Sequence, residues 1–357
     1  MKKYSMIMKK SLSDISWLVT EEEYRADPAL SYSTLAKFER GGFNELNKLF
    51  DKVESPSLTF GSAVDSLLTG GEAEFNERFL VAEFPSISDN LIQIAKILHA
   101  RYGETHRSVD TISDSILAEV GKECDFYAND KYANYRVKLI KENCDEYYNL
   151  LYLSTGKTIL DTQTYSDVLR AVEVLKTSES TKDYFFDNNP FNPDVEGFYQ
   201  LKFKATLNGI EYRCMFDRIN VFHNLKLIQP IDLKTSYKKE WDFYKSFIEW
   251  NYQIQNRLYY RILEAVIKQD DYYKDFKILP YKNIVVSRYS LTPLVWDCDF
   301  TSAMGTLRFG ENKQIIMRDP EEIGRELSQY LSTAHRVPMG INLNGGNDLR
   351  TWMNKMV

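Results

Sequence analysis

Two aspartates and a lysine are the residues of this chain whose types and spacing could do chemistry. Asp232 and Lys234 are two apart in an apolar stretch, so their side chains point the same way if the stretch is a strand. Asp217 lies fifteen residues earlier, inside the apolar run 215–219. A polar break at residues 223–226 separates the two stretches at their midpoint. If that break is a hairpin turn, the two carboxylates face each other roughly 5 Å apart at Cβ and form a divalent-metal site beside a lysine.

The residues around these acids alternate with a period of two, which predicts an antiparallel meander over residues 196–235. Asn208-Gly209 is a strong signal for a two-residue hairpin turn between the first two strands. The return strand carries its apolar residues on one face: Ile210, Tyr212, Cys214 and Phe216. A third strand is expected over residues 225–234. Pro230 cannot donate to a sheet ladder, so we expect a bulge or a poorly paired position just before Asp232.

Helices are expected on both sides of the meander, because apolar residues recur there at spacings of three and four. The elements expected outside the meander are helices at 31–38, 58–68, most of 91–183, 238–269 with a break near Glu249, and 321–331, together with a strand at 283–290 that pairs with a segment around Trp296. Gln255 and Tyr259 are four apart on a helix face that is otherwise apolar. Gly61 favours close packing of the second helix, which also carries Asp65.

Composition sets limits on the class of protein. The chain has 357 residues, of which 43% are hydrophobic and 14% aromatic, enough for one large or two ordinary domains with a packed core. No run of ~18 apolar residues or apolar leader is present, so we expect a soluble, cytoplasmic protein with no membrane contact. The net charge of −6 has the wrong sign for holding nucleic acid by bulk attraction, but a local basic groove is compatible with it. The four cysteines show no CxxC or CxxxH spacing, which argues against a zinc, iron–sulfur or disulfide framework.

Taken together, these residues resemble the PD-(D/E)xK nuclease superfamily, and within it the RecB-like and exonuclease VIII-like (RecE-type) exonucleases of phages and prophages. The resemblance covers roughly residues 30–310. The five elements that carry it are Gly61 to Asp65, Glu196, Asp217, Asp232-Leu233-Lys234, and Gln255 with Tyr259. The covered stretch also includes Gly156 to Leu160, which resembles the family's lead into its pre-core helix. An isolated DxK arises by chance in many proteins, whereas five elements in this order and spacing are a specific signal.

The fold implied by this resemblance is α/β (α+β). It has a restriction-endonuclease-like core, in which a mixed central sheet is flanked by helices, and a large helical N-terminal part. Along the chain, the resemblance implies a mainly helical region at 1–185, which contributes the Gly61–Asp65 helix to the site. It places the nuclease core at 186–310 and a C-terminal helix and tail at 311–357.

The resemblance also implies a metal site. Asp217 resembles the acid of the PD motif and Asp232 the acid of (D/E)xK, and both would bind Mg²⁺ or Mn²⁺ with the Leu233 carbonyl as a further ligand. Hard oxygen ligands suit these ions, whereas zinc prefers histidine or cysteine. The family usually has GxxxH, and in this chain Asp65 stands where the metal-binding histidine is expected. An aspartate oxygen can replace that ligand, so we expect Asp65 to complete the site.

The remaining site residues take their roles from the same resemblance. Lys234 would orient or help to deprotonate the attacking water and offset charge on the scissile phosphate. Glu196 resembles the acid that precedes the first core strand and would bind a second metal or a water. Gln255 and Tyr259 match the QxxxY motif, which supports the site and the DNA backbone.

The activity implied is a metal-dependent exonuclease that resects linear double-stranded DNA for recombination. Its partners would be double-stranded DNA with free ends, a single-strand annealing protein and further copies of the chain in a ring-shaped homo-oligomer. If the chain is phage-encoded, it would act in the host cytoplasm.

Other interpretations stay open. Asp217 and Asp232 could be ordinary acids that pair with Arg213 or Lys234 across strands, with Gln255 and Tyr259 as packing residues. A catalytically weak or inactive nuclease fold that binds DNA or a protein would also fit the acidic charge and the missing histidine. A Cas4-like or helicase-associated nuclease shares this core, but such proteins usually carry a four-cysteine cluster that these cysteine positions do not form.

Overall fold

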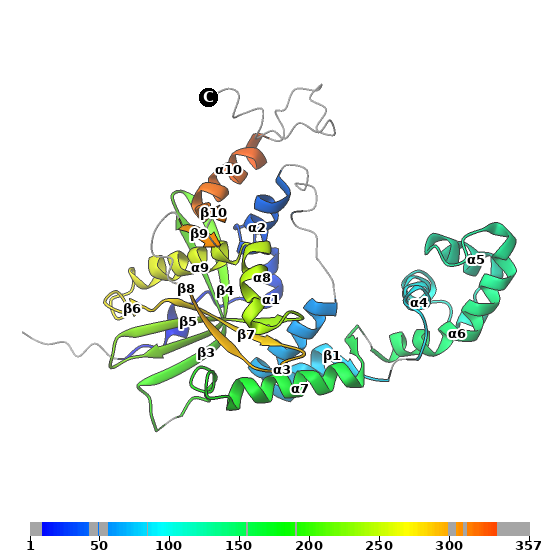
Figure 1. Cartoon of the computed structure of the whole chain (residues 1–357), viewed down its shortest axis with the longest axis horizontal. Helices are drawn as coiled ribbons and strands as arrows, with labels where there is room; N and C mark the ends of the chain where they lie inside the picture. The colour runs from blue at the N-terminus through cyan, green and yellow to red at the C-terminus, as the bar shows by residue number, and fades with distance from the viewer. Residues whose placement is uncertain are drawn as a thin grey trace, which may run out of the picture. The chain divides into compact units, whose positions relative to one another are not determined.

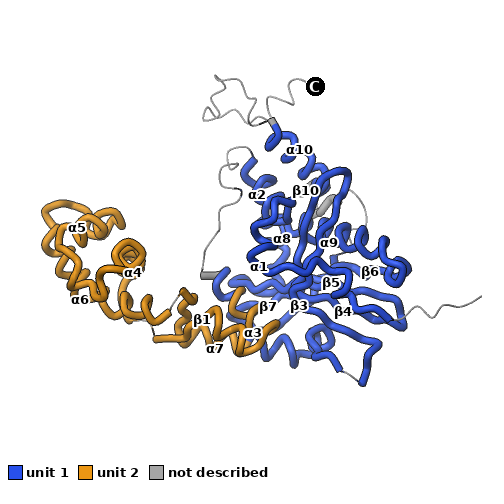
Figure 2. Tube along the Cα trace, turned by 180° about the vertical axis from the view of Figure 1, so that it is seen from behind, with its two compact units in different colours: residues 1–61, 171–357 blue, residues 62–170 orange. Residues whose placement is uncertain are grey.

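The chain forms two compact units in the computed structural model, which describes residues 9–42, 49, 56–83, 85–154, 156–189, 191–298, 305–309 and 313–333. The first unit comprises residues 1–61 with 171–357, and the second comprises residues 62–170 (Figure 2). These boundaries differ from the division at 185 and 310 expected from the sequence. The reason is packing: Leu12, Leu35 and Phe38 share one hydrophobic core with strand residues such as Phe216. The predicted C-terminal tail lies outside the described residues.

The first unit is built on a six-stranded mixed sheet (Figure 1). Its strands are β3 (Val195–Leu207), β4 (Ile210–Phe222), β5 (Leu227–Ser236), β6 (Lys277–Ile278), β7 (Tyr281–Ser287) and β8 (Leu294–Cys298). They lie in the order β3-β4-β5-β7-β8, with β6 also beside β5. Strand β5 runs parallel to β6 and β7, and the other neighbours are antiparallel. The predicted α/β fold with a mixed sheet flanked by helices is confirmed.

Two hairpin turns produce the predicted meander. Asn208 and Gly209 join β3 to β4 with φ of 49° and 81°, and a type I′ turn requires positive φ at both positions. The second turn occupies residues 223–226, where the Lys226 amide donates to the His223 carbonyl at 3.1 Å. The ladder between β4 and β5 then runs without interruption to the pair Arg218 and Ile231. The midpoint of the two apolar stretches was therefore a correct guide to the turn.

Pro230 marks a break on one side of β5 only. On the β4 side it pairs with Ile219 in a continuous ladder, so the expected bulge is absent there. On the other side the partner strand changes, and the register advances by one residue between Ile228↔Ile278 and Ile231↔Lys282. A proline lacks the N–H that a ladder needs, and here it occupies the gap between two partner strands. The expected poorly paired position just before Asp232 is confirmed on this side.

Helices and a further hairpin accompany the sheet in the first unit. They are η1 (Leu12–Ile15), α1 (Glu21–Ala26), α2 (Tyr32–Gly41), η5 (Glu240–Asp242), α8 (Phe243–Glu249), α9 (Tyr252–Ile267), β9 (Gly305–Phe309), β10 (Lys313–Met317) and α10 (Pro320–Thr333). Helix α9 packs on β3 and β4, and α2 and α10 pack against α9. The Ser31 hydroxyl caps α2 by accepting from the Thr34 amide. Asn251, with φ of 56°, separates α8 from α9 and confirms the predicted break near Glu249.

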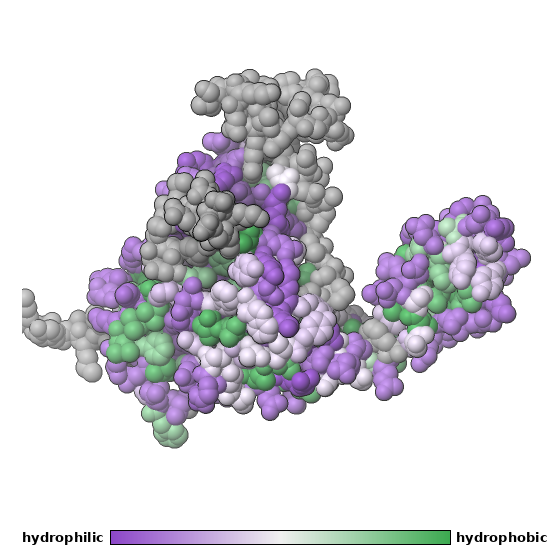
Figure 3. Space-filling view, viewed as in Figure 1, coloured by the Kyte–Doolittle hydropathy of each residue, from purple (hydrophilic) through white to green (hydrophobic). Residues whose placement is uncertain are grey.

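The second unit is mainly helical, as the sequence predicted. Its elements are α3 (Pro56–Arg78), β1 (Phe79–Val81), α4 (Asp89–Tyr102), η3 (Val109–Thr111), α5 (Asp114–Glu123), η4 (Asp130–Tyr132), α6 (Ala133–Ser154), β2 (Thr158–Leu160) and α7 (Thr162–Thr177), of which α3 and α7 begin or end in the first unit. Strands β1 and β2 pair in parallel, and α4, α5 and α6 are inserted between them around a core of their own. In Figure 3 the visible face of these three helices is hydrophilic outside and hydrophobic where the helices meet. No helix among the described residues is both long enough and apolar enough to cross a bilayer.

Candidate active site

Asp217 and Asp232 lie at the same level on neighbouring strands, directly beyond the last paired residues of β4 and β5. The ladder ends at the pair Arg218 and Ile231, and the next position on each strand is one of the two acids. Beyond this pair, a side chain instead of a backbone carbonyl accepts the hydrogen bond between the strands: Asp217 Oδ2 accepts from the Leu233 amide at 2.8 Å. The two carboxylates are thus held at one edge of the β4–β5 pair, where the hairpin geometry was expected to bring them.

Asp232, Lys234 and Gln255 form a closed triangle of polar contacts. Lys234 Nζ lies 2.7 Å from Asp232 Oδ2 and donates to Gln255 Oε1 at 2.9 Å. Gln255 Nε2 donates to Asp232 Oδ1 at 2.5 Å. Asp232 is only 2% exposed, and Gln255 is 5% exposed. Helix α9 therefore supplies one amide side chain that fixes both the acid and the lysine of β5.

An aromatic pair lies beside the Lys234 ammonium. Its Nζ lies 4.2 Å from the centre of the Tyr252 ring, and the Tyr32 ring centre lies 6.2 Å from that of Tyr252. Burial is the largest single effect and disfavours the charge on Lys234, but the attractions of Asp232, Tyr252, Tyr32 and Asp217 together outweigh it and raise the pKa of the lysine. Lys234 is therefore an ammonium at neutral pH, suited to orienting and neutralising rather than to accepting a proton.

Sequence reasoning did not single out Tyr32 and Tyr252 as site residues. A signal for Tyr252 was available, because it lies three residues before Gln255 and so on the same face of α9. No comparable signal existed for Tyr32, which reaches the site from α2, more than two hundred residues away in sequence. Only the packing of α2 against α9 brings it there.

Tyr259 lies in the core behind the site. The residue is 7% exposed, and its ring centre is 5.3 Å from that of Phe216. Burial raises the pKa of Tyr259 well above its usual value, with further contributions from Tyr24, Cys214 and the two site carboxylates. The phenol is therefore neutral, and its burial suits the supporting part of the role expected for QxxxY rather than contact with a DNA backbone.

The donor set at this edge fits a hard divalent cation. Asp232 Oδ2 is buried and accepts no hydrogen bond of acceptable geometry, although the Lys234 ammonium is 2.7 Å away. The described residues contain no group of three or more His, Cys, Asp or Glu side chains that could hold a metal. Mg²⁺ commonly takes only one or two carboxylates and completes its shell with water and phosphate oxygens. Asp217, Asp232 and the Leu233 carbonyl match that mode, and they do not match a zinc site.

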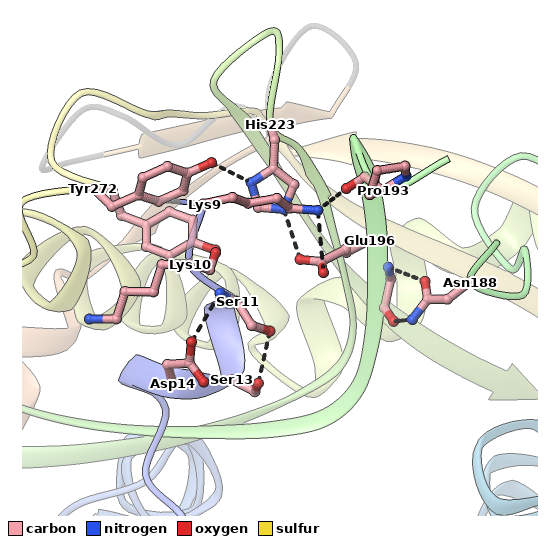
Figure 4. Close-up of polar contacts among 12 residues, drawn as sticks. Lys9, Lys10, Ser11, Ser13, Asp14, Asn188, Pro193, Glu196, His223 and Tyr272 are labelled. Atoms are coloured by element: carbon pink, nitrogen blue, oxygen red, sulfur yellow. Dashed lines mark hydrogen bonds and ion pairs between the residues drawn. The ribbon is translucent and has the colours of Figure 1, made fainter. Parts of the chain in front are cut away.

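Glu196 is not brought to the two aspartates. It lies opposite Val221 on β4, four residues along the strand from Asp217. There its Oε2 lies 2.7 Å from His223 Nε2, and His223 Nδ1 lies 2.9 Å from the Tyr272 hydroxyl, so that the imidazole stands between the two (Figure 4). Lys9 Nζ lies 3.5 Å from Glu196 Oε1. The structure therefore gives Glu196 a separate polar cluster.

Gly61 and Asp65 fall on either side of the boundary between the units. A Cβ at Gly61 would lie 2.7 Å from Thr235 Oγ1, which confirms the close packing expected at this glycine. Thr235 follows Lys234 on β5, so the first turns of α3 touch the strand that carries the site. Asp65 belongs to the second unit, and its role as a metal ligand stays a prediction.

Comparisons with known proteins add little to this geometry. No family model matches the chain, and no curated protein matches it. Among solved structures, the chain is similar to one from Eubacterium rectale described as a "Putative exonuclease". The two share 13% sequence identity with a TM-score of 0.39, over 90% of this chain and 86% of the other.

Proposed function

We propose that this protein is a metal-dependent deoxyribonuclease. The observation that carries the proposal is the polar triangle at the β4–β5 edge: Asp232, Lys234 and Gln255 in mutual contact, with Asp217 joined to the adjoining amide. An ordinary cross-strand ion pair needs none of this support. Burying an acid and a lysine together carries a large desolvation cost, and proteins tolerate such groups mainly at functional sites.

Each residue has a defined part in this proposal. Asp217, Asp232 and the Leu233 carbonyl would hold Mg²⁺ or Mn²⁺, which supplies Lewis-acid activation of water and charge stabilisation for phosphodiester hydrolysis. Lys234 keeps its proton, orients the nucleophilic water and offsets charge on the scissile phosphate. Gln255 holds the lysine and Asp232 in one geometry, so that neither side chain has to reorganise during the reaction.

The finer function rests on the sequence resemblance. We propose that the substrate is linear double-stranded DNA with free ends, that the reaction is exonucleolytic, and that the single strands produced serve recombination in the cytoplasm. A single-strand annealing protein and a ring-shaped homo-oligomer are the partners that go with this activity. Asp65 is included as a proposed metal ligand on the same basis, whereas Glu196, which contacts His223, is left out of the proposed site.

The test is incubation of the purified chain with Mg²⁺ or Mn²⁺ and three DNAs: linear duplex, closed circular duplex and single strand. We expect loss of the linear duplex alone. Lys234→Ala and Asp232→Asn should abolish it, whereas Lys274→Ala, which removes an exposed lysine that pairs with Asp271, should not. Cleavage by the Asp232→Asn or Lys234→Ala protein at the wild-type rate would show that the site is assigned to the wrong residues.

A second candidate is a nuclease fold that binds DNA without cutting it. Two observations favour it: Asp65 stands where the family's metal-binding histidine is expected, and the net charge is −6. Calorimetric titration with Mn²⁺ separates the two candidates. A binding-only protein should take up Mn²⁺ no better than the Asp217→Asn, Asp232→Asn double variant, whereas the enzyme should bind it measurably more tightly.

A further inference from the structure

Three aromatic residues lie just beyond the carboxyl ends of the parallel strands β5 and β7. Tyr237 follows β5 and Tyr289 follows β7, and their ring centres are 5.7 Å apart with the planes inclined by 62°. Tyr289 is 70% exposed, and Trp241 in η5 is 53% exposed. Single exposed aromatic residues are common on protein surfaces and need no explanation. These three differ because the surrounding structure is built to hold them.

The carboxylate of Glu240 holds the segments that carry Trp241 and Tyr289 together. This side chain is fully buried, yet its Oε1 accepts from the Ser287 amide at 3.0 Å and from the Thr292 amide at 2.9 Å, while its Oε2 accepts from the Ser290 hydroxyl at 2.5 Å. A buried carboxylate is costly unless such bonds satisfy it. Glu240 thereby ties the loop that carries Tyr289 to the segment that carries Trp241.

Cationic side chains accompany the rings. Arg288 donates to the Tyr237 hydroxyl at 3.1 Å, and its guanidinium carbon lies 5.4 Å from the centre of the Phe60 ring. Lys239 is exposed and holds its ammonium 5.0 Å from the centre of the Trp241 ring. Aromatic faces next to positive charges are the composition that binds single-stranded nucleic acid, in which bases stack on the rings and phosphates meet the cations.

We propose that Tyr237, Trp241 and Tyr289 form a stacking platform for the unpaired bases of a DNA single strand. The platform begins three residues after Lys234 on the same chain segment, so a strand lying on it would lead to or from the candidate site. This inference rests on the proposed function for the identity of the ligand. A duplex keeps its base faces inside its own stack, and the platform therefore selects frayed ends or single strands.

The test measures binding without cleavage. The full chain in EDTA is titrated against a fluorescein-labelled single strand of roughly twelve thymidines, a length within the usual site size, and binding is followed by anisotropy. The platform variant is Trp241→Ala with Tyr289→Ala. Its matched control is Tyr127→Ala with Tyr135→Ala, which removes two rings of the second unit that are 45% and 48% exposed. An abasic strand of equal length separates base stacking from phosphate attraction.

We expect the platform variant to weaken binding of the thymidine strand by about fivefold or more, while the control variant stays within about twofold of wild type. The wild-type chain should prefer the thymidine strand to the abasic one, and the platform variant should lose that preference. Equal binding by wild type and platform variant, no binding by either, or an equal loss in the control variant would overturn the proposal. A chain that cuts no DNA but shows the selective loss would remove the nuclease proposal and leave the platform standing.

Discussion

Asp217 accepts a hydrogen bond of 2.8 Å from the backbone amide of Leu233, the residue between the acid and the lysine of β5. Where the β4–β5 ladder ends, this carboxylate accepts the hydrogen bond that a backbone carbonyl of the neighbouring strand would otherwise accept. The bond has two consequences. It sets the level of Asp217 against Asp232, and it makes the geometry of the candidate site depend on a side chain that a metal would also contact.

Substitutions of Asp217 should separate these two roles. An asparagine keeps an oxygen for the Leu233 amide but removes the charge, whereas an alanine removes both. We expect both variants to lose Mn²⁺ affinity. Only Asp217→Ala should lose about 1–3 kcal/mol of unfolding free energy, because it leaves a partly buried amide without its acceptor. Urea unfolding and Mn²⁺ titration measure the two effects, and equal destabilisation by both variants would contradict the structural role of the bond.

Gln255 should affect the rate of the chemical step without contacting the substrate. Gln255→Met keeps the length of the side chain but removes its contacts with Asp232 and Lys234. We expect kcat to fall by about 10- to 100-fold with little change in KM, as for other residues that orient metal ligands. Gln269→Met, near the exposed end of the same helical segment, is the control and should cleave like wild type. A rise in KM alone would indicate that Gln255 contacts DNA instead.

Substitution of Glu196 tests whether this acid supports the fold, as its contacts indicate, or binds a metal or water, as the family resemblance implies. The structure places it with His223 and Tyr272, so Glu196→Gln should lower the unfolding free energy by about 1–2 kcal/mol and leave the cleavage rate near that of wild type. His223→Ala should lower the unfolding free energy less in the Glu196→Gln background than in the wild type, because the contact between the two residues is already weakened there. A double-mutant cycle measures this difference. If Glu196→Gln abolished cleavage while the fold stayed intact, the acid would belong to the active site after all.

Gly61 should tolerate no side chain while Thr235 is present. A Cβ at position 61 would meet Thr235 Oγ1 at 2.7 Å, and a β-branched threonine has little freedom to move aside. Gly61→Val should therefore cost about 1–3 kcal/mol in unfolding free energy. Thr235→Ala should restore part of that loss in the double variant. Thermal unfolding of the four proteins tests this contact, and purely additive effects would show that the two residues do not touch.

Burial should protect three of the four cysteines from alkylation. Burial raises the pKa of Cys144 and of Cys298 to about 12, and it raises that of Cys214 well above the usual value. A raised thiol pKa lowers the thiolate fraction at any pH below it, so the native protein at pH 8 should react slowly at these positions and faster as the pH rises. Iodoacetamide followed by mass spectrometry should find half-buried Cys124 modified first. Rapid labelling of Cys298, which contacts Asn283 beside the site, would show that this region is open.

The sequence by itself determined the meander and the meeting of Asp217 with Asp232. Strand period, the Asn208-Gly209 turn and the polar break at 223–226 are local signals, and an antiparallel hairpin converts equal distances from a turn into spatial opposition. Gln255 could be predicted from the sequence for a similar reason, since helical periodicity fixes which residues share a face.

Tertiary structure alone decided the surroundings of the site. The ring of Tyr32 reaches Tyr252 from the N-terminal segment, and Glu196 turns to His223 and Tyr272 instead of the aspartates. The N-terminal segment joins the sheet unit because its apolar residues complete that core, a choice made by long-range burial. Such contacts depend on how whole elements pack, and neither a period of two nor a period of 3.6 carries that information.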